Sequence, residues 1–155
     1  MIDMPEIILE LANAHEGKFS KIKKSINFYN KLDYKNKSIK FQVFKYSEIA
    51  TEDFNWFNVY KKLFISNSIW QKIFKLVKNK KIWIDVFDNY SLDVIKNNQK
   101  YIYGIKLQSS VLKNHYLIED LLKLDLRKVK LLINVSGVEK KNHINFKKNF
   151  FKKKF

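Results

Sequence analysis

The chain has 155 residues, 46% of them hydrophobic, which is enough for a single domain with an apolar core. It contains no cysteine, so a disulfide framework and a thiolate metal site are excluded. No apolar run approaches the roughly 20 residues that a membrane-spanning helix needs. The acidic residues 1–6 lack the basic-then-apolar pattern of a signal peptide, and we therefore expect a soluble, cytoplasmic protein.

The formal net charge of +16 comes almost entirely from lysine, and Arg127 is the only arginine. Arginine is the residue that reads bases and holds phosphates in a bidentate fashion. The lysines are spread along the chain and accompany abundant Asn, Ile, Phe and Tyr, a mixture typical of an A/T-rich coding sequence. The charge therefore indicates a solvated basic surface rather than a dedicated nucleic-acid site.

Apolar runs and helical stripes alternate along the chain. In chain order, we expect a strand at 7–11, a helix at 19–31, a strand at 38–44, a loop at 47–53, an aromatic-rich helix at 54–64, a helix with the apolar stripe Ile69, Ile73, Phe74 and Val77, a strand at 81–87, a helix at 91–97, a strand at 101–108, a helix at 116–124 and a strand at 129–135. Ser66 or Ser68 can cap the helix that carries the stripe. This alternation predicts a parallel α/β sheet built from right-handed βαβ units.

Two segments leave alternatives open. The aromatic residues of 54–64 can stack nucleic-acid bases, although packing of a short helix on the exterior of the fold is the interpretation that we prefer. Residues 140–155 contain seven lysines interleaved with apolar residues. They can form a basic amphipathic helix for a membrane surface or nucleic acid, a helix of the fold, or the product of a frameshift.

Polar side chains interrupt the apolar strands at Glu10, Lys40, Gln42, Lys106 and Ser109. Such groups cost free energy inside an apolar strand unless they face something that they bind. We expect Glu10 to be buried at the end of its strand. Because the carboxyl ends of parallel strands meet at one edge, the pattern predicts one ligand site there.

Five segments resemble the sialic acid synthase (N-acetylneuraminate synthase) family in order and spacing, from residue 7 to about residue 138. They are a strand-end Glu followed by a turn with His and Gly at 10–17, Lys-x-Gln at 40–42, Phe-Asp-x-x-Ser at 87–91, Lys-x-x-Ser at 106–109 and a turn similar to Ser-Thr-Gly at 135–137. The resemblance implies a (β/α)₈ TIM barrel. We expect about five of its βα units in residues 1–138 and a basic C-terminal tail or helix at residues 139–155.

The resemblance also implies an activity, in which phosphoenolpyruvate condenses with an N-acetylmannosamine-type sugar and a divalent metal, manganese or magnesium, acts as a Lewis acid. Glu10 would be the catalytic carboxylate. Lys40 and Gln42 would contact the acceptor sugar, and Lys106 and Ser109 would hold phosphoenolpyruvate.

Each of these residues also has a structural interpretation. Glu10 can form an ion pair with Lys40 on the next strand, and Gln42 can be a satisfied core amide. His15 is interpreted as a turn residue close to the site. Asp88 is interpreted as the cap of the helix that follows it.

The chain departs from the family pattern at Val111 and Val135, where family members carry Glu and Ser. Neither His115 nor His143 matches the family's metal-binding histidines. Asp85 is a possible ligand, but the chain's own residues do not support a metal site.

A complete barrel of this class needs about 250 residues and eight strands. With five strands, the first and the last would have open edges, and we expect marginal stability or aggregation. Three explanations of a five-strand chain are open: a truncated or frameshifted reading frame, a second chain that completes the barrel, and an independent half-barrel. We favour the first. The alternative function is a non-catalytic basic protein that binds nucleic acid or anionic surfaces.

Overall fold

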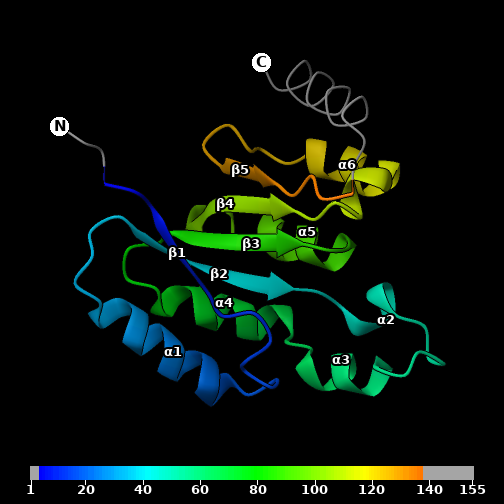
Figure 1. Cartoon of the computed structure of the whole chain (residues 1–155), viewed down its shortest axis with the longest axis horizontal. Helices are drawn as coiled ribbons and strands as arrows, with labels where there is room; N and C mark the ends of the chain where they lie inside the picture. The colour runs from blue at the N-terminus through cyan, green and yellow to red at the C-terminus, as the bar shows by residue number, and fades with distance from the viewer. Residues whose placement is uncertain (1–3, 138–155) are drawn as a thin grey trace.

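The computed structural model describes residues 4–137 and contains one parallel sheet with helices along one side (Figure 1). Its strands follow one another in the order β1-β2-β3-β4-β5. They are β1 (Ile7–Glu10), β2 (Lys37–Val43), β3 (Ile82–Val86), β4 (Ile102–Leu107) and β5 (Lys130–Ile133). The predicted α/β fold with about five parallel βα units is therefore confirmed.

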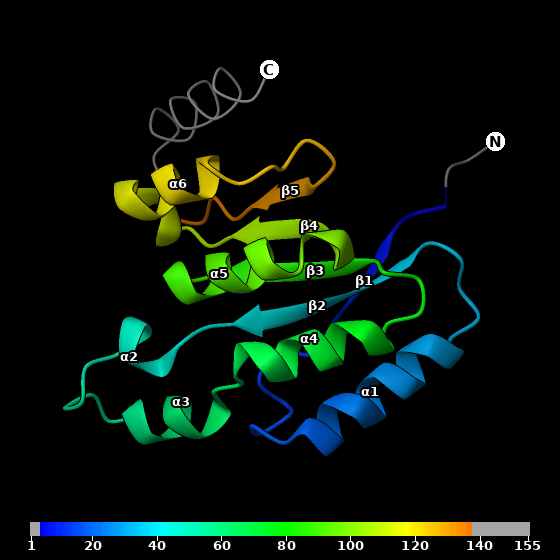
Figure 2. The same ribbon diagram turned by 180° about the vertical axis from the view of Figure 1, so that it is seen from behind.

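The helices connect these strands. They are α1 (Phe19–Lys31), α2 (Tyr46–Ile49), α3 (Phe57–Leu63), α4 (Asn67–Leu76), α5 (Asn89–Asn97) and α6 (His115–Leu122), with short 3₁₀ turns at Gln99–Tyr101 and Val111–Lys113. Seen from behind, α5 lies in front of the sheet, and β1, its first strand, passes behind β2 and β3 (Figure 2). No helix within residues 4–137 is long and apolar enough to cross a membrane.

The periodic apolar positions explain the main helices. Ile22, Ile26 and Tyr29 recur every three or four residues along α1 and are buried, so this helix spans the predicted residues 19–31. In α4, Trp70 joins the predicted stripe and is buried as well. Ser66 stands at the N-cap of α4 as expected, but its side chain accepts no capping hydrogen bond.

The two faces of the sheet differ in polarity because side chains alternate along each strand. One face is apolar, is covered by helices and forms the core, with Ile39, Phe41, Val43, Ile82, Ile84, Val86, Ile105 and Leu107 all buried. The alternate positions include Lys40, Gln42, Asp85 and Lys106. The opposite face is therefore lined with polar groups toward the carboxyl ends of the strands.

The sheet is curled so that its two outer strands approach each other across this polar face. The Glu6 carboxylate, just before β1, accepts a hydrogen bond from Trp83 Nε1 of β3 at 3.2 Å. It also forms an ion pair with Lys130 Nζ of β5 at 2.9 Å. A contact between the two ends of a five-stranded sheet requires the curvature of a half-barrel.

Two expectations about single elements are wrong. Strand β1 is not buried: Ile7 is 46% exposed and Glu10 is also exposed, because β1 has only one neighbouring strand in the described sheet. The expected loop at 47–53 begins with the four-residue helix α2.

The aromatic segment 54–64 forms a shorter helix than predicted, α3, which packs on α2 and also contacts Phe44, the residue after β2, through Tyr60. Tyr46 makes edge-to-face contacts with Phe57 and Phe64, at centroid distances of 5.4 and 5.8 Å. Phe54 and Trp56 remain 47% and 59% exposed. The expected boundary at residue 138 and the basic tail at 139–155 lie outside the described residues.

Candidate functional site

The predicted polar residues meet on one face of the sheet because the strand register aligns them. Glu10 is paired with Lys40 across β1 and β2. Gln42 is paired with Asp85 across β2 and β3, and Asp85 with Lys106 across β3 and β4. Residues paired in this way in a parallel sheet point to the same face. We call Glu10, Lys40, Asp85 and Lys106 the charged cluster.

The charged cluster alternates in sign from β1 to β4. Lys40 Nζ lies 2.9 Å from Glu10 Oε2 and 3.7 Å from Asp85 Oδ1. Lys106 Nζ lies 3.8 Å from Asp85 Oδ2. The ion pair between Glu10 and Lys40, expected as the structural interpretation, is therefore present, and Lys40 also reaches a second carboxylate.

Burial within the cluster decreases outward from Asp85. The Asp85 side chain is fully buried, that of Lys40 is 7% exposed, that of Lys106 is 19% exposed and that of Glu10 is 41% exposed. A ligand that approaches the polar face would therefore reach Glu10 and Lys106 first.

The pKa values respond to this burial and to the neighbouring charges. Burial raises the pKa of the Asp85 carboxyl although Lys40 and Lys106 act to lower it. Burial also lowers the pKa of Lys106, helped by the adjacent Lys40. For Lys40, burial acts to lower the pKa, but the hydrogen bond to Glu10 and the charge of Asp85 raise it overall. Asp85 and Lys106 are thus the two members whose charged forms the environment disfavours.

Three amide side chains extend the cluster. Gln108 Nε2 donates to Asp85 Oδ2 at 3.3 Å, and Asn134 Nδ2 donates to Gln108 Oε1 at 3.2 Å. Gln42 Nε2 donates to Glu10 Oε1 at 3.4 Å, so its amide is partly satisfied within the protein. The sequence interpretation missed Gln108 and Asn134. Their positions in the sequence could have indicated them, because Gln108 lies two residues after Lys106 and Asn134 directly follows β5.

The remaining predicted residues lie beside the charged cluster. Ser109 follows β4, is half-buried, and makes no side-chain hydrogen bond within residues 4–137. His15 is a buried turn residue as predicted: its Nδ1 accepts a hydrogen bond from the Gly17 amide at 2.9 Å, and burial lowers its pKa.

Asp88 is confirmed as a helix cap. Its Oδ1 accepts from the Ser91 amide of α5 at 2.8 Å, and its Oδ2 accepts from the Lys45 amide after β2 at 2.6 Å. One carboxylate therefore fixes both the start of α5 and the loop that follows β2.

Hollows in the part of the chain that the structure describes lie at and near these strand ends. A hollow of about 490 Å³ lies beyond the carboxyl ends and is lined by Asn13, Gln42, Phe44, Glu48, Ile49, Tyr60, Phe87 and Ser110. Another, of about 360 Å³ between β1 and α1, is lined by Leu9, Glu10, Leu11, Lys24, Ser25, Phe28, Tyr29 and Ile39. Each thus contains one predicted site residue, Gln42 or Glu10.

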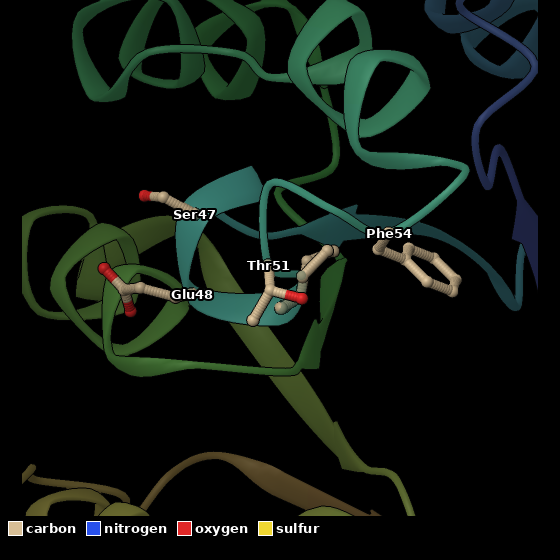
Figure 3. A pocket seen from close by; sticks show the side chains of 6 residues that line it. Ser47, Glu48, Thr51 and Phe54 are labelled. Atoms are coloured by element: carbon tan, nitrogen blue, oxygen red, sulfur yellow. The ribbon is translucent and has the colours of Figure 1, made fainter.

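The third hollow, about 380 Å³, is formed by α2 and the turn after it (Figure 3). Its lining consists of Ser47, Glu48, Ile49, Ala50, Thr51 and Phe54. Figure 3 shows Glu48 and Phe54 on opposite sides of Thr51. None of the predicted site residues lines it, and we do not assign it to the candidate site.

The described residues do not fit a divalent metal ion. Within residues 4–137 there is no group of three or more His, Cys, Asp and Glu side chains that could hold one. The Asp85 carboxylate, considered above as a ligand, has its oxygens facing Lys40, Lys106 and Gln108. Two ammonium groups beside one carboxylate repel a cation.

No family model and no curated protein matches the chain. Solved structures do match it. The N-acetylneuraminic acid (sialic acid) synthetase from Leptospira borgpetersenii serovar Hardjo-bovis, in complex with citrate, superposes with a TM-score of 0.77 at 20% identity, covering 96% of this chain and 50% of that one.

Two proteins described as spore coat polysaccharide biosynthesis protein E match similarly. That from Chromobacterium violaceum has a TM-score of 0.77 at 17% identity, over 97% of this chain and 46% of that one. That from Bacillus subtilis has a TM-score of 0.71 at 17% identity, over 97% of this chain and 42% of that one.

The chain thus spans about half the length of the solved structures that it matches. The structural resemblance predicted from the five sequence segments is confirmed at the level of the fold. The described residues form a half-barrel like that in about half of a sialic-acid-synthase-type protein.

Proposed function

We propose that this half-barrel binds the substrates of a sialic-acid-synthase-type condensation, in which phosphoenolpyruvate joins an N-acetylmannosamine-type sugar. The observation that carries the proposal is that Lys40 of β2 and Lys106 of β4, the parallel strands on either side of β3, both face Asp85 toward the carboxyl ends of the strands. Barrel enzymes place their sites at this end. The fold match to a sialic acid synthetase supports the choice of reaction.

Lys106 and Ser109 are the proposed binding residues for phosphoenolpyruvate. A lysine ammonium is a point charge with three donors, suited to phosphate or carboxylate, and a serine hydroxyl adds one more donor. The Lys106 side chain is 19% exposed, so an anion can reach it. Its distance of 3.8 Å from Asp85 is longer than a hydrogen bond, which leaves its donors available.

Glu10, Lys40 and Gln42 are the proposed residues for the acceptor sugar. The Glu10 carboxylate is 41% exposed and retains acceptor capacity beside its bonds to Lys40 and Gln42. It can therefore accept a proton from a sugar hydroxyl, which is the catalytic role that we assign to it. Manganese or magnesium would polarise the sugar aldehyde in the reaction, but residues 4–137 offer no site for it, and no role here depends on it.

Titration calorimetry of the full chain with phosphoenolpyruvate tests this proposal. Lys106→Met is expected to weaken binding by about tenfold or more, because it removes a charged hydrogen-bond donor. Lys72→Met removes the same charge from the exposed side of α4 and is the matched control. Equal affinities of the two variants, or no binding to the unaltered chain, would contradict the assignment.

The acceptor side is tested separately, by titrating N-acetylmannosamine into the chain saturated with phosphoenolpyruvate. Glu10→Gln keeps the size of the side chain but removes the negative charge, and we expect weaker sugar binding with unchanged phosphoenolpyruvate binding. An equal loss for both ligands would contradict the division of roles.

A further inference from the structure

Asp85 is a fully buried carboxylate held against the two cations proposed to bind substrate. Its oxygens lie 3.7 Å from Lys40 Nζ and 3.8 Å from Lys106 Nζ. Both distances are longer than a charged hydrogen bond of about 2.7–2.9 Å. Oδ1 has no hydrogen-bond donor within the described residues, whereas Oδ2 accepts only a 3.3 Å bond from Gln108.

The charges of the cluster are balanced without any ligand. Two carboxylates, Glu10 of β1 and Asp85 of β3, face two ammonium groups, Lys40 of β2 and Lys106 of β4. Glu10 is exposed enough for water to screen its charge, but Asp85 is not. An anion placed between the lysines would therefore meet a second negative charge in a region of low dielectric constant.

We propose that Asp85 is an internal competitor for anionic ligands at Lys40 and Lys106, so that an anion binds there together with one proton taken up by Asp85. The proton comes from solvent and is held by the Asp85 carboxyl, and the lysines then turn their donors to the ligand. This inference builds on the proposed function, since phosphoenolpyruvate is such an anion.

Three features support the proposal. The unpaired Oδ1 can hold the proton without breaking a hydrogen bond, because none is made to it within residues 4–137. The 3.7–3.8 Å separations leave the lysine donors uncommitted to Asp85. Burial already raises the pKa of Asp85, so protonation of this carboxyl is less costly than that of an exposed one.

The test uses sulfate as the probe, because its charge does not change near neutral pH. Asp85→Asn removes the internal charge with little change in shape, and we expect the full chain to bind sulfate about tenfold more tightly. Asp93→Asn removes an exposed carboxylate from α5 and controls for net charge. Equal sulfate affinity of the Asp85→Asn and Asp93→Asn variants would overturn the proposal.

The unaltered chain gives a second, independent measurement. Calorimetric titration of sulfate in two buffers of different ionisation enthalpy counts the protons taken up on binding, and binding itself should tighten as the pH falls. We expect an uptake that approaches one proton and is absent in Asp85→Asn. An uptake of zero, or no sulfate binding by either protein, would overturn the inference.

These outcomes are separable from those of the proposed function. Tight, proton-linked sulfate binding together with no phosphoenolpyruvate binding would end the substrate assignment and leave the role of Asp85 intact. Phosphoenolpyruvate binding that depends on Lys106 but not on Asp85 would support the substrate assignment and contradict the role proposed for Asp85.

Discussion

Lys40 connects the two carboxylates of the charged cluster, and these carboxylates differ sharply in burial. It lies 2.9 Å from Glu10, which is 41% exposed, and 3.7 Å from Asp85, which is fully buried. How much an ion pair contributes to the stability of the fold depends on how deeply it is buried. An exposed pair contributes little, whereas removing one partner of a buried pair leaves an uncompensated charge inside the protein.

Replacing Lys40 should therefore destabilise the fold far more than replacing Glu10. We expect Lys40→Met to lower the free energy of unfolding by about 3 kcal/mol and Glu10→Gln by less than about 1 kcal/mol. Urea denaturation of both variants measures the difference. Similar losses for the two would contradict the view that Asp85, rather than Glu10, makes Lys40 necessary.

Asp88 gives a prediction about pH. Burial raises its pKa to about 6, from 3.8, although amides of Lys45 and Ser91 act to lower it. The folded state therefore binds a proton more tightly than the unfolded state does. The raised pKa of Asp88 therefore stabilises the fold to its full extent below about pH 4, and this stabilisation is lost as the pH rises through about 6.

Asp88→Asn should remove this titration. Between about pH 5 and pH 7.5, we expect the unaltered chain to lose about 1 kcal/mol of stability relative to the variant. Comparing the two profiles of unfolding free energy against pH isolates this group from the other carboxyls. Parallel profiles, or a relative gain of stability with rising pH, would show that Asp88 does not titrate in this range.

At the scale of elements, strands β3 and β4 depend on a close approach of Trp83 to Gly104. A Cβ atom added at Gly104 would lie 2.5 Å from the Trp83 ring, which is closer than atoms can pack. Trp83 is held in place by its hydrogen bond to Glu6. Only glycine therefore allows the indole to lie over β4.

Gly104→Ala should lower the free energy of unfolding by about 1–3 kcal/mol, the usual cost of overpacking. The same change made in a Trp83→Leu background should cost much less, because the colliding ring is gone. Thermal or urea denaturation of the four proteins gives the coupling. Additive losses would exclude the ring contact as the cause.

The elements could be predicted where apolar periodicity is strong. Helix α1 was predicted at its observed bounds because Ile22, Ile26 and Tyr29 form a clear buried stripe. Helix α2 was missed because four residues are too short to display a period, and contacts of Tyr46 with α3 hold it. The burial of β1 was predicted wrongly because its composition carries no information on how many neighbours a strand has.

The candidate site was only partly predictable, because part of it depends on how separate strands are aligned. Lys40 and Lys106 could be found because a charged residue inside an apolar strand is conspicuous. The position of Asp85 between them depends on the register of three strands, which no single segment encodes. Gln108 and Asn134 lie beyond their strands, where the alternation that marks a facing residue has ended.

At the scale of the whole molecule, the half-barrel has open outer strands. Within residues 4–137, β1 and β5 each pair with one strand only. Open edges favour association through further strand pairing. The net charge of +16 opposes association, because copies of the chain repel one another until salt screens them.

We therefore expect association that increases with both protein and salt concentration, as measured by sedimentation velocity. Ile7→Lys places a charge on the outer strand β1 and should reduce it, whereas Val59→Lys adds the same charge at an exposed position of α3 and should have less effect. A monomer under all conditions, or an equal effect of both variants, would argue against edge pairing.

We propose that the carboxyl ends of β1–β4 bind phosphoenolpyruvate through the charged cluster. Residue-resolved reductive methylation of lysine, quantified by mass spectrometry with and without phosphoenolpyruvate, is a direct test of this binding. We predict that phosphoenolpyruvate protects Lys106 and leaves Lys72 unchanged. Modification of Lys106 that is unaffected by phosphoenolpyruvate, or protection concentrated among the lysines of residues 140–155, would contradict the claim.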